Sequence, residues 1–230
     1  MYVRTIILQK KDHITTEDFQ KYWLEKHGPL AKKLFCGGLK HYYQNHITTS
    51  SRLGIESTRS NYIADGFAQL FFEEGTSLKE MVNEEGLSVL KEDEAHFIGS
   101  MQIVITKPNS IVNPNRNRPL IKTISLLKRK KNIDIDRFKK EWLQIHPDHI
   151  LAMSGVEGYI QHFVVDRTID KKNSATYDEV PIDGIEELWF EDTESMERAF
   201  QSENGLKMME HSKSFLEEKT TFIVREHKVF

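Results

Sequence analysis

Two stretches of this 230-residue chain decide its fold: EDFQKYWLEKHGPL at Glu17–Leu30 and DRFKKEWLQIHPDH at Asp136–His149. The second repeats the first, so that a phenylalanine, a tryptophan and a histidine recur four residues apart in each. Further matches follow in the same order, GLKHYYQ with GVEGYIQ and DGFAQLFFE with DGIEELWFE. Such self-similarity is typical of a duplicated structural unit. We therefore expect two homologous halves of about 110 residues each.

The segment between the two copies reads KPNSIVNPNRNRPL, residues 107–120, and holds three of the six prolines of the chain. Proline and asparagine at this density are typical of a connection rather than of a helix or strand. The sequence therefore predicts a first domain over 1–107, a linker over 108–118 and a second domain over 119–230.

Each half shows the same order of hydrophobic patterns. An apolar run rich in β-branched residues predicts a strand, and an N-cap at Thr16 or Asp134 begins an amphipathic helix. A second strand, a polar loop and a third strand follow, and then a second helix starts at Thr76 or Thr193 before a closing strand. The order βαββαβ is that of the ferredoxin-like α+β fold, an antiparallel sheet with both helices on one face.

The third strand of the first half indicates that the other face of the sheet is covered as well. Alternation places Phe67, Gln69 and Phe71 on one face, and the apolar residues between them on the other. Both faces are therefore largely apolar, and the nearest partner is the sheet of the other half. We predict that the two antiparallel sheets pack together as an intrachain pseudodimeric α+β barrel.

Composition excludes several classes of protein. The 32 basic and 35 acidic residues give no excess positive charge for nucleic acid. No apolar run is long enough for a membrane span, and the N-terminus is charged too early for a secretory signal. The single cysteine, Cys36, allows neither an intrachain disulfide nor a cysteine-built zinc site. A cytoplasmic protein without nucleic-acid or membrane partners is expected.

The repeated histidines are the first candidates for chemistry. Phe19, Trp23 and His27 lie on one stripe of a helix, and His146 ends the equivalent stripe of the second half. Core packing is one explanation of such a stripe. However, proline follows each histidine within two residues and should break the helix there. A histidine at a helix break beside tryptophan suits a general acid or base.

The second strand carries a polar pattern that accompanies the histidines. Tyr42, Gln44 and His46 share one face, and the first two recur as Tyr159 and Gln161, whereas a phenylalanine replaces the histidine. These side chains either line a polar pocket or hydrogen-bond across strands.

In the third strand, Gln69 and its counterpart Glu187 lie beside Phe71 and Trp189. Either the carboxylate lies among aromatic rings with a raised pKa, or this face is partly wet.

Two other clusters of polar residues are weaker candidates for a functional site. His146, Asp148 and His149 lack a firm third metal ligand, and the first half has Leu30 in place of His149, so no metal site is predicted. The acidic run 92–94 either places a carboxylate at the mouth of a pocket or lies on an exposed helix face.

The stretches FQKYWLEKHGPLAKKL and GLKHYYQNHI resemble the EthD family of the dimeric α+β barrel superfamily, and so does YDEVPIDGIEELWFED in the second half. The resemblance implies ferredoxin-like halves that form a barrel. Related barrels act as cofactor-independent cyclases, isomerases, dehydratases and monooxygenases, and others bind haem. By position it places the family's histidine at His27 and His146, and its Tyr-x-Gln-x-His at residues 42–46. The second half departs at 147–149 and at Phe163, which puts two equivalent sites in doubt.

The leading hypothesis is a cofactor-independent lyase, cyclase or isomerase that moves a proton on a small hydrophobic carbonyl compound. One alternative is a non-catalytic ligand-binding or accessory protein, and another is a haem-binding or oxygen-using monooxygenase-like barrel. The chain could also form a homodimer. The predicted catalytic residues are His27, His46 and His146. The predicted substrate-binding residues are Phe19, Trp23, Tyr42, Gln44, Gln69, Trp142, Tyr159, Gln161, Glu187 and Trp189.

Overall fold

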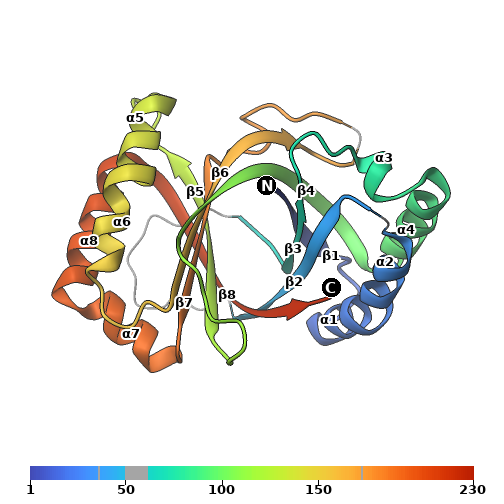
Figure 1. The fold of residues 1–230 in the computed structure, drawn as a ribbon, viewed down its shortest axis with the longest axis horizontal. Helices are drawn as coiled ribbons and strands as arrows, with labels where there is room; N and C mark the ends of the chain where they lie inside the picture. Colours follow the sequence, from blue (N-terminus) through green and yellow to red (C-terminus); the bar gives the residue numbers. More distant parts are fainter. Residues whose placement is uncertain (36, 50–61, 172) are drawn as a thin grey trace.

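The structure is a computed structural model, and it describes residues 1–230 except 36, 50–61 and 172 (Figure 1). Cys36 and most of the predicted polar loop lie outside the described residues. The first half consists of β1 (Tyr2–Lys10), α1 (Thr16–Tyr22), a π-helical turn η1 (Trp23–His27), α2 (Gly28–Leu34), β2 (Leu39–Thr49), β3 (Gly66–Phe72), α3 (Leu78–Met81), α4 (Glu84–Phe97) and β4 (Ile98–Val112).

The second half repeats this order, with α7 longer than its counterpart α3. It consists of β5 (Ile121–Arg129), α5 (Ile135–Lys139), the π-helical turn η2 (Lys140–Ile145), α6 (His146–Leu151), β6 (Gly158–Thr168), β7 (Gly184–Phe190), α7 (Thr193–Gln201), α8 (Glu203–Phe215) and β8 (Leu216–Lys228).

The strands form one closed antiparallel barrel in the order β1-β3-β2-β8-β5-β7-β6-β4. Within each half the order is that of a ferredoxin-like sheet, and the pairs β2·β8 and β4·β6 join the two sheets. The helices of the first half cover one side of the barrel and those of the second half cover the other (Figure 1). The predicted pseudodimeric α+β barrel is confirmed.

The predicted linker is partly wrong, because β4 continues to Val112. Its first part pairs with β1 as far as Thr106, and its later part, including Pro108, pairs with β6. At Pro108 the strand has passed the end of its pairing with β1, so the missing N–H interrupts no bond on that side. One strand therefore belongs to both sheets.

Helix boundaries differ from the predictions at the start of α1 and in the second helix of each half, where the helix predicted from Thr193 is divided into α7 and α8. Thr15, not Thr16, caps α1, since its hydroxyl accepts a hydrogen bond from the backbone N–H of Asp18. The single helix predicted from Thr76 is instead the short α3 followed by α4, whose N-cap is Asn83. Asn83 accepts from the backbone N–H of Gly86 and so starts a new helix.

The prolines after the histidines do not end the helix. The chain widens into the π-helical turn η1, in which the N–H of Gly28 donates to the carbonyl of Trp23, and Pro29 then lies at the start of α2. At that position proline loses no intrahelical bond. The Nε2 of Gln44 donates to the same Trp23 carbonyl at 2.9 Å. Thus the predicted break is a register shift that keeps the helix continuous.

Side chains fill the interior of the barrel in layers. One layer is apolar and includes Ile7, Phe67, Ile124 and Phe222. The neighbouring layer is polar and is centred on Lys122, which is 1% exposed. The helix-facing surfaces of the two sheets pack separately against the helices of their own halves. Any site beneath the helices is therefore separated from the barrel interior by a sheet.

Candidate functional site

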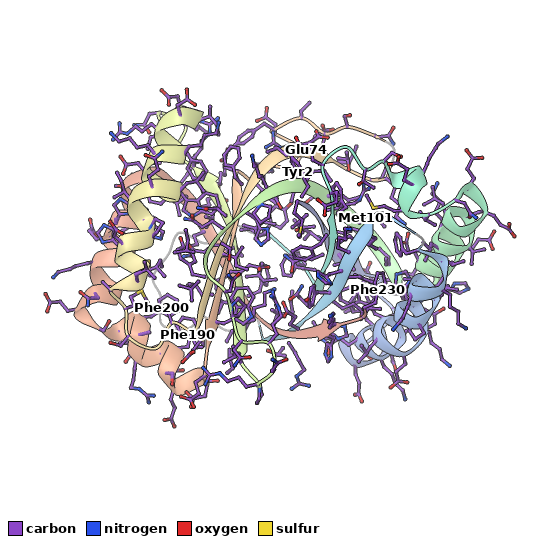
Figure 2. The ribbon with its side chains drawn as sticks, in the orientation of Figure 1. Tyr2, Glu74, Met101, Phe190, Phe200 and Phe230 are labelled. Carbon is purple, nitrogen blue, oxygen red and sulfur yellow. The ribbon has the colours of Figure 1, made fainter. Side chains whose placement is uncertain are left out.

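A cavity of about 40 Å³ lies between the sheet and the helices of the first half. Its walls are mostly apolar and include Trp23, Leu70, Leu90 and Met101. Met101 faces the α2 and α4 side of the barrel (Figure 2). The polar residues that line it are Arg4, His27, Tyr42, Glu94 and Lys171. Three of the predicted site residues, Trp23, His27 and Tyr42, thus meet at one cavity.

A carboxylate orients the imidazole of His27. The Nδ1 of His27 donates to Asp93 Oδ2 at 2.6 Å, and the hydroxyl of Tyr22 donates to the other oxygen at 2.8 Å. Burial acts to raise the pKa of Asp93, but the hydrogen bonds from His27 and Tyr22 lower it below its ordinary value. Asp93 is therefore ionised at neutral pH. It fixes the His27 tautomer whose Nε2 is a proton acceptor.

Tyr42 lies beside this pair and stays protonated. Its hydroxyl accepts from Trp23 Nε1 at 3.0 Å and from Gln44 Nε2 at 3.4 Å. Burial raises the pKa of Tyr42 well above its ordinary value. Because both contacts use the hydroxyl oxygen as acceptor, the O–H hydrogen is available to a molecule in the cavity.

The other first-half candidates have packing partners. Phe19 is fully buried against Trp23 and Phe97. His46 stacks on Trp23, with ring centroids 4.7 Å apart, and its Nε2 donates to Gln44 Oε1 at 3.0 Å. Burial, reinforced by His227 and Arg225, lowers the pKa of His46 to about 3. His46 is therefore neutral at the pH of cells and does not line the cavity.

The far end of the cavity is cationic. Arg4 points from β1 toward the helices, and its Nη2 is a buried atom without a hydrogen-bond partner among the described residues. Lys171, from the segment after β6, pairs with both oxygens of Glu94 at 2.5 and 2.7 Å. Two cations thus face one carboxylate.

An open cleft of about 390 Å³ adjoins this end. It shares Glu94, Ile98 and Met101 with the cavity, and Asp170 of the second half lines its outer side. Figure 1 shows the segment after β6 reaching toward α3 and α4. The cleft and the cavity are thus in contact through these shared residues.

The second half fills the equivalent space with charged side chains. In matching strand registers, Glu186 takes the place of Ala68 and Lys219 takes the place of Met101, and these two groups form an ion pair. Phe190 and Phe200 pack together between β7 and α7, with ring centroids 5.6 Å apart (Figure 2).

His146 is one link in a chain of hydrogen bonds. Its Nδ1 is 3.0 Å from His211 Nδ1, so one ring donates and the other accepts, and its Nε2 is 3.5 Å from Glu186. The outer nitrogen of His211 donates to Glu141 at 3.3 Å. Burial lowers the pKa of His146 below its ordinary value. His211 stands where Asp93 stands in the first half, so no carboxylate directly orients His146 Nδ1.

The other second-half candidates make structural contacts. Gln161 donates to the Trp142 carbonyl and to the hydroxyl of Tyr159, which repeats the contacts of Gln44 in the first half. The ring of Trp142 packs closely over Gly184, where an added Cβ would lie 2.3 Å from it. These residues support the π-helical turn.

Gln69, Glu187 and Trp189 lie on the opposite face of the sheet, inside the barrel. Lys122 Nζ is 3.0 Å from Glu187 Oε1 and 3.2 Å from Gln69 Oε1, and it lies 4.8 Å from the centre of the Trp189 ring. Neither alternative for Glu187 holds: the side chain is 1% exposed, and its pKa is not raised. Burial alone would raise it, but Lys122 and His162 hold it well below its ordinary value.

Sequence reasoning missed Arg4 and Lys171, and it left Asp93 open between a pocket mouth and an exposed helix face. Asp93 is 66 residues from its partner His27, and Lys171 reaches the cavity from the other half. The repeat contains a usable signal, because the second half replaces Arg4 by Thr123 and Asp93 by His211. Among the described residues no group of three or more metal-ligating side chains occurs.

A closed barrel of two ferredoxin-like halves, with a cavity beneath the helices of one half, defines a tandem dimeric α+β barrel protein. The model of the EthD domain matches residues 11–100 and 130–219, so the chain belongs to the EthD domain family and carries two copies of the domain. No curated protein sequence matches the chain significantly. Within the described residues, no helix is long and apolar enough to cross a membrane.

Solved structures with similar folds cover nearly the whole chain. A putative monooxygenase from Fusobacterium nucleatum has a TM-score of 0.64 at 8% identity, covering 98% of this chain and 91% of its own. An anthrone oxidase-like protein has a TM-score of 0.61 at 8% identity, covering 99% and 92%. A mutant chlorite dismutase from Candidatus Nitrospira defluvii has a TM-score of 0.50 at 13% identity, covering 97% and 90%. At these identities the likeness establishes the fold alone.

Proposed function

We propose that the first-half cavity is the active site of a cofactor-independent enzyme that removes a proton from a small, largely apolar carbonyl compound. The observation that carries the proposal is the His27–Asp93 pair. Asp93 contacts only Nδ1 of His27, and His27 lines an apolar cavity with Nε2 left as a proton acceptor. A carboxylate-oriented imidazole in a dry pocket is a common general base. In the second half His211 replaces the carboxylate at His146 Nδ1, and Glu186 lies at His146 Nε2, which favours a single active site.

Each residue of the cavity has a separate role in the proton transfer. His27 Nε2 accepts the proton from a C–H next to the carbonyl, and Asp93 stabilises the imidazolium that forms. The hydroxyl of Tyr42 donates to the carbonyl oxygen as it becomes an enolate. Trp23 and Leu90 exclude water, which strengthens both interactions.

Molecular oxygen is the favoured acceptor of the resulting electron pair. This choice is supported by the names of the neighbours, putative monooxygenase and anthrone oxidase-like protein, which share the whole fold. In the balanced reaction a CH2 group becomes C=O: the carbon loses two hydrogens, one atom of O2 stays on the carbon and the other leaves as water. Lyase or isomerase chemistry would use the same proton transfer without oxygen.

Haem does not fit this site. The cavity of about 40 Å³ is far below the roughly 300 Å³ of the smallest ordinary ligand pockets. The same volume restricts the substrate to a small molecule.

The test uses 2-oxobutyrate as the probe, because it has a CH2 beside a carbonyl. Under nitrogen in D2O, the protein should catalyse deuterium exchange at this CH2, followed by NMR. His27→Asn should lower the rate about 100-fold or more, since general-base catalysis contributes roughly 10²–10⁴-fold. Asp93→Asn should lower it at least about 10-fold. His13→Ala, at an exposed histidine, should leave it unchanged.

In air, the same variants should rank in the same order for oxygen uptake, with one O2 consumed per substrate. Exchange without oxygen uptake would overturn the oxygenase step and leave the lyase or isomerase alternative. Binding of the probe in the cavity without any exchange would overturn the enzyme proposal in favour of a ligand-binding protein.

A further inference from the structure

The cationic end of the cavity contains a guanidinium nitrogen whose hydrogen-bonding capacity the fold does not use. Arg4 Nη2 is buried and has no hydrogen-bond partner among the described residues. Burial lowers the pKa of Arg4, but a guanidinium remains charged at neutral pH. The nearest carboxylate in the cavity, Glu94, already pairs with Lys171 through both oxygens. Asp166 on β6 and Glu94 both attract Arg4 electrostatically, but no hydrogen bond joins either carboxylate to Arg4 Nη2.

The unpartnered Arg4 Nη2 leaves hydrogen-bonding capacity that a bound anion would use. A buried N–H group without a hydrogen-bond partner is unfavourable, and nearly all buried polar groups in proteins have a partner. The barrel itself does not require an arginine here, because Thr123 occupies the same register position in the second half. Arg4 is thus explained by a ligand rather than by packing.

We propose that the cavity recognises the carboxylate of a small apolar acid, with Arg4 as its main binding group and Lys171 as a second. The inference rests on the proposed function for the same site and names its substrate class. A guanidinium suits a carboxylate because its donors form a planar fork. The apolar walls at Leu70 and Leu90 then hold the carbon skeleton.

The placement also orients the substrate. Arg4 comes from β1, whereas His27 comes from η1, and both line one cavity. A carboxylate bound at Arg4 leaves the rest of the molecule inside the apolar walls, where His27 reaches a C–H. Lys171 belongs to the second half, so the second half contributes a specificity group to the active site of the first.

The test compares isobutyrate with isobutyramide, which has nearly the same shape without the charge, in NMR titrations of the full-length protein. Isobutyrate should bind at least about 10-fold more tightly, as expected for a charge-assisted hydrogen bond of 1.5–3 kcal/mol. Arg4→Met should remove this preference, and Arg4→Lys should restore part of it. Glu94→Gln should tighten isobutyrate binding several-fold, because it removes the competing carboxylate.

Stability separates a binding role from a structural one. Arg4→Met should melt no lower than the wild type, because it removes a buried N–H group without a hydrogen-bond partner and keeps an apolar stem of similar length, which offsets the lost attraction to Glu94 and Asp166. Equal binding of the acid and the amide, or a large fall in the melting temperature of Arg4→Met, would overturn the proposal. Isobutyrate preference without deuterium exchange on 2-oxobutyrate would refute the enzyme proposal alone, and exchange without the preference would refute the anion site alone.

Discussion

The protonation of His46 predicts a specific loss of stability in acid. The ring is 4% exposed, stacks on Trp23 and has a pKa of about 3 in the folded protein, against 6.5 when unfolded. The fold therefore favours the neutral ring. Its contribution is complete above about pH 6.5 and is lost as the pH falls below that value, because the unfolded chain then binds a proton that the folded chain does not.

The size of the effect follows from the two pKa values. Between pH 8 and pH 5, His46 alone should lower the free energy of unfolding by about 2 kcal/mol. The groups that oppose its charge are His227, 4.6 Å away between ring centroids, and Arg225, both on β8. Other buried histidines, such as His146, add their own losses, so a variant must isolate the contribution of His46.

The matched variant is His46→Phe, because Phe163 occupies this position in the second half and packs in the cluster that contains Trp142. It removes a hydrogen bond to Gln44, which costs about 1 kcal/mol at every pH. Urea unfolding at pH 8 and pH 5 should show a loss about 2 kcal/mol smaller in the variant than in the wild type. His13→Ala should behave as the wild type.

Equal acid losses in His46→Phe and the wild type, within about 0.5 kcal/mol, would refute this reasoning. Such a result would mean that His46 holds an ordinary pKa in the fold, and it would return to consideration as an acid–base group. The expected result instead removes it from the catalytic candidates and leaves His27.

Two further predictions concern the packing around the tryptophans and the charged core of the second half. Gly66→Ala places a Cβ 2.5 Å from the Trp23 ring and should lower the free energy of unfolding in urea by about 1–3 kcal/mol, whereas Gly37→Ala, with open space around it, should change it by less than about 0.5 kcal/mol. Glu186→Ala removes the buried carboxylate that pairs with Lys219 and His146, and should lower the melting temperature by an amount equivalent to about 3–5 kcal/mol. Adding Lys219→Met, which completes the alanine–methionine pair of the first half, should recover part of that loss, and a double variant less stable than the single one would contradict the pairing.

The fold could be predicted because its signals are local or repeated. The β-branched runs, the Phe-Trp-His stripe and the alternation around Gln69 each depend on neighbouring residues, and the repeat adds the symmetry. The course of β4 past Pro108 could not be predicted in this way, because it depends on pairing with β6 of the other half. The π-helical turn could not be predicted either, since the Gln44 side chain that donates to its Trp23 carbonyl lies on a separate strand.

The candidate site was predictable only in part, for the same reason. His27 and Trp23 stand out within one helix, but Asp93 and Lys171 come from distant segments that only the closed barrel brings to them. Arg4 appeared as an ordinary charge at the start of a strand. Arg4 is a candidate because its Nη2 has no hydrogen-bond partner among the described residues, and no local sequence pattern reveals this.

The joining of the sheets through β2·β8 has a consequence for how the chain is made. Tyr43 of β2 pairs with Lys228 of β8, so this edge of the first sheet stays unpaired until a strand some 185 residues later in the chain has been synthesised. Contacts of such long range close slowly, and an open strand edge invites pairing with other chains. A nascent first half therefore leaves the ribosome with two unprotected edges, and the barrel closes only after β6 and β8 emerge. We expect refolding yield to fall as protein concentration rises, and chaperones to matter most during that interval.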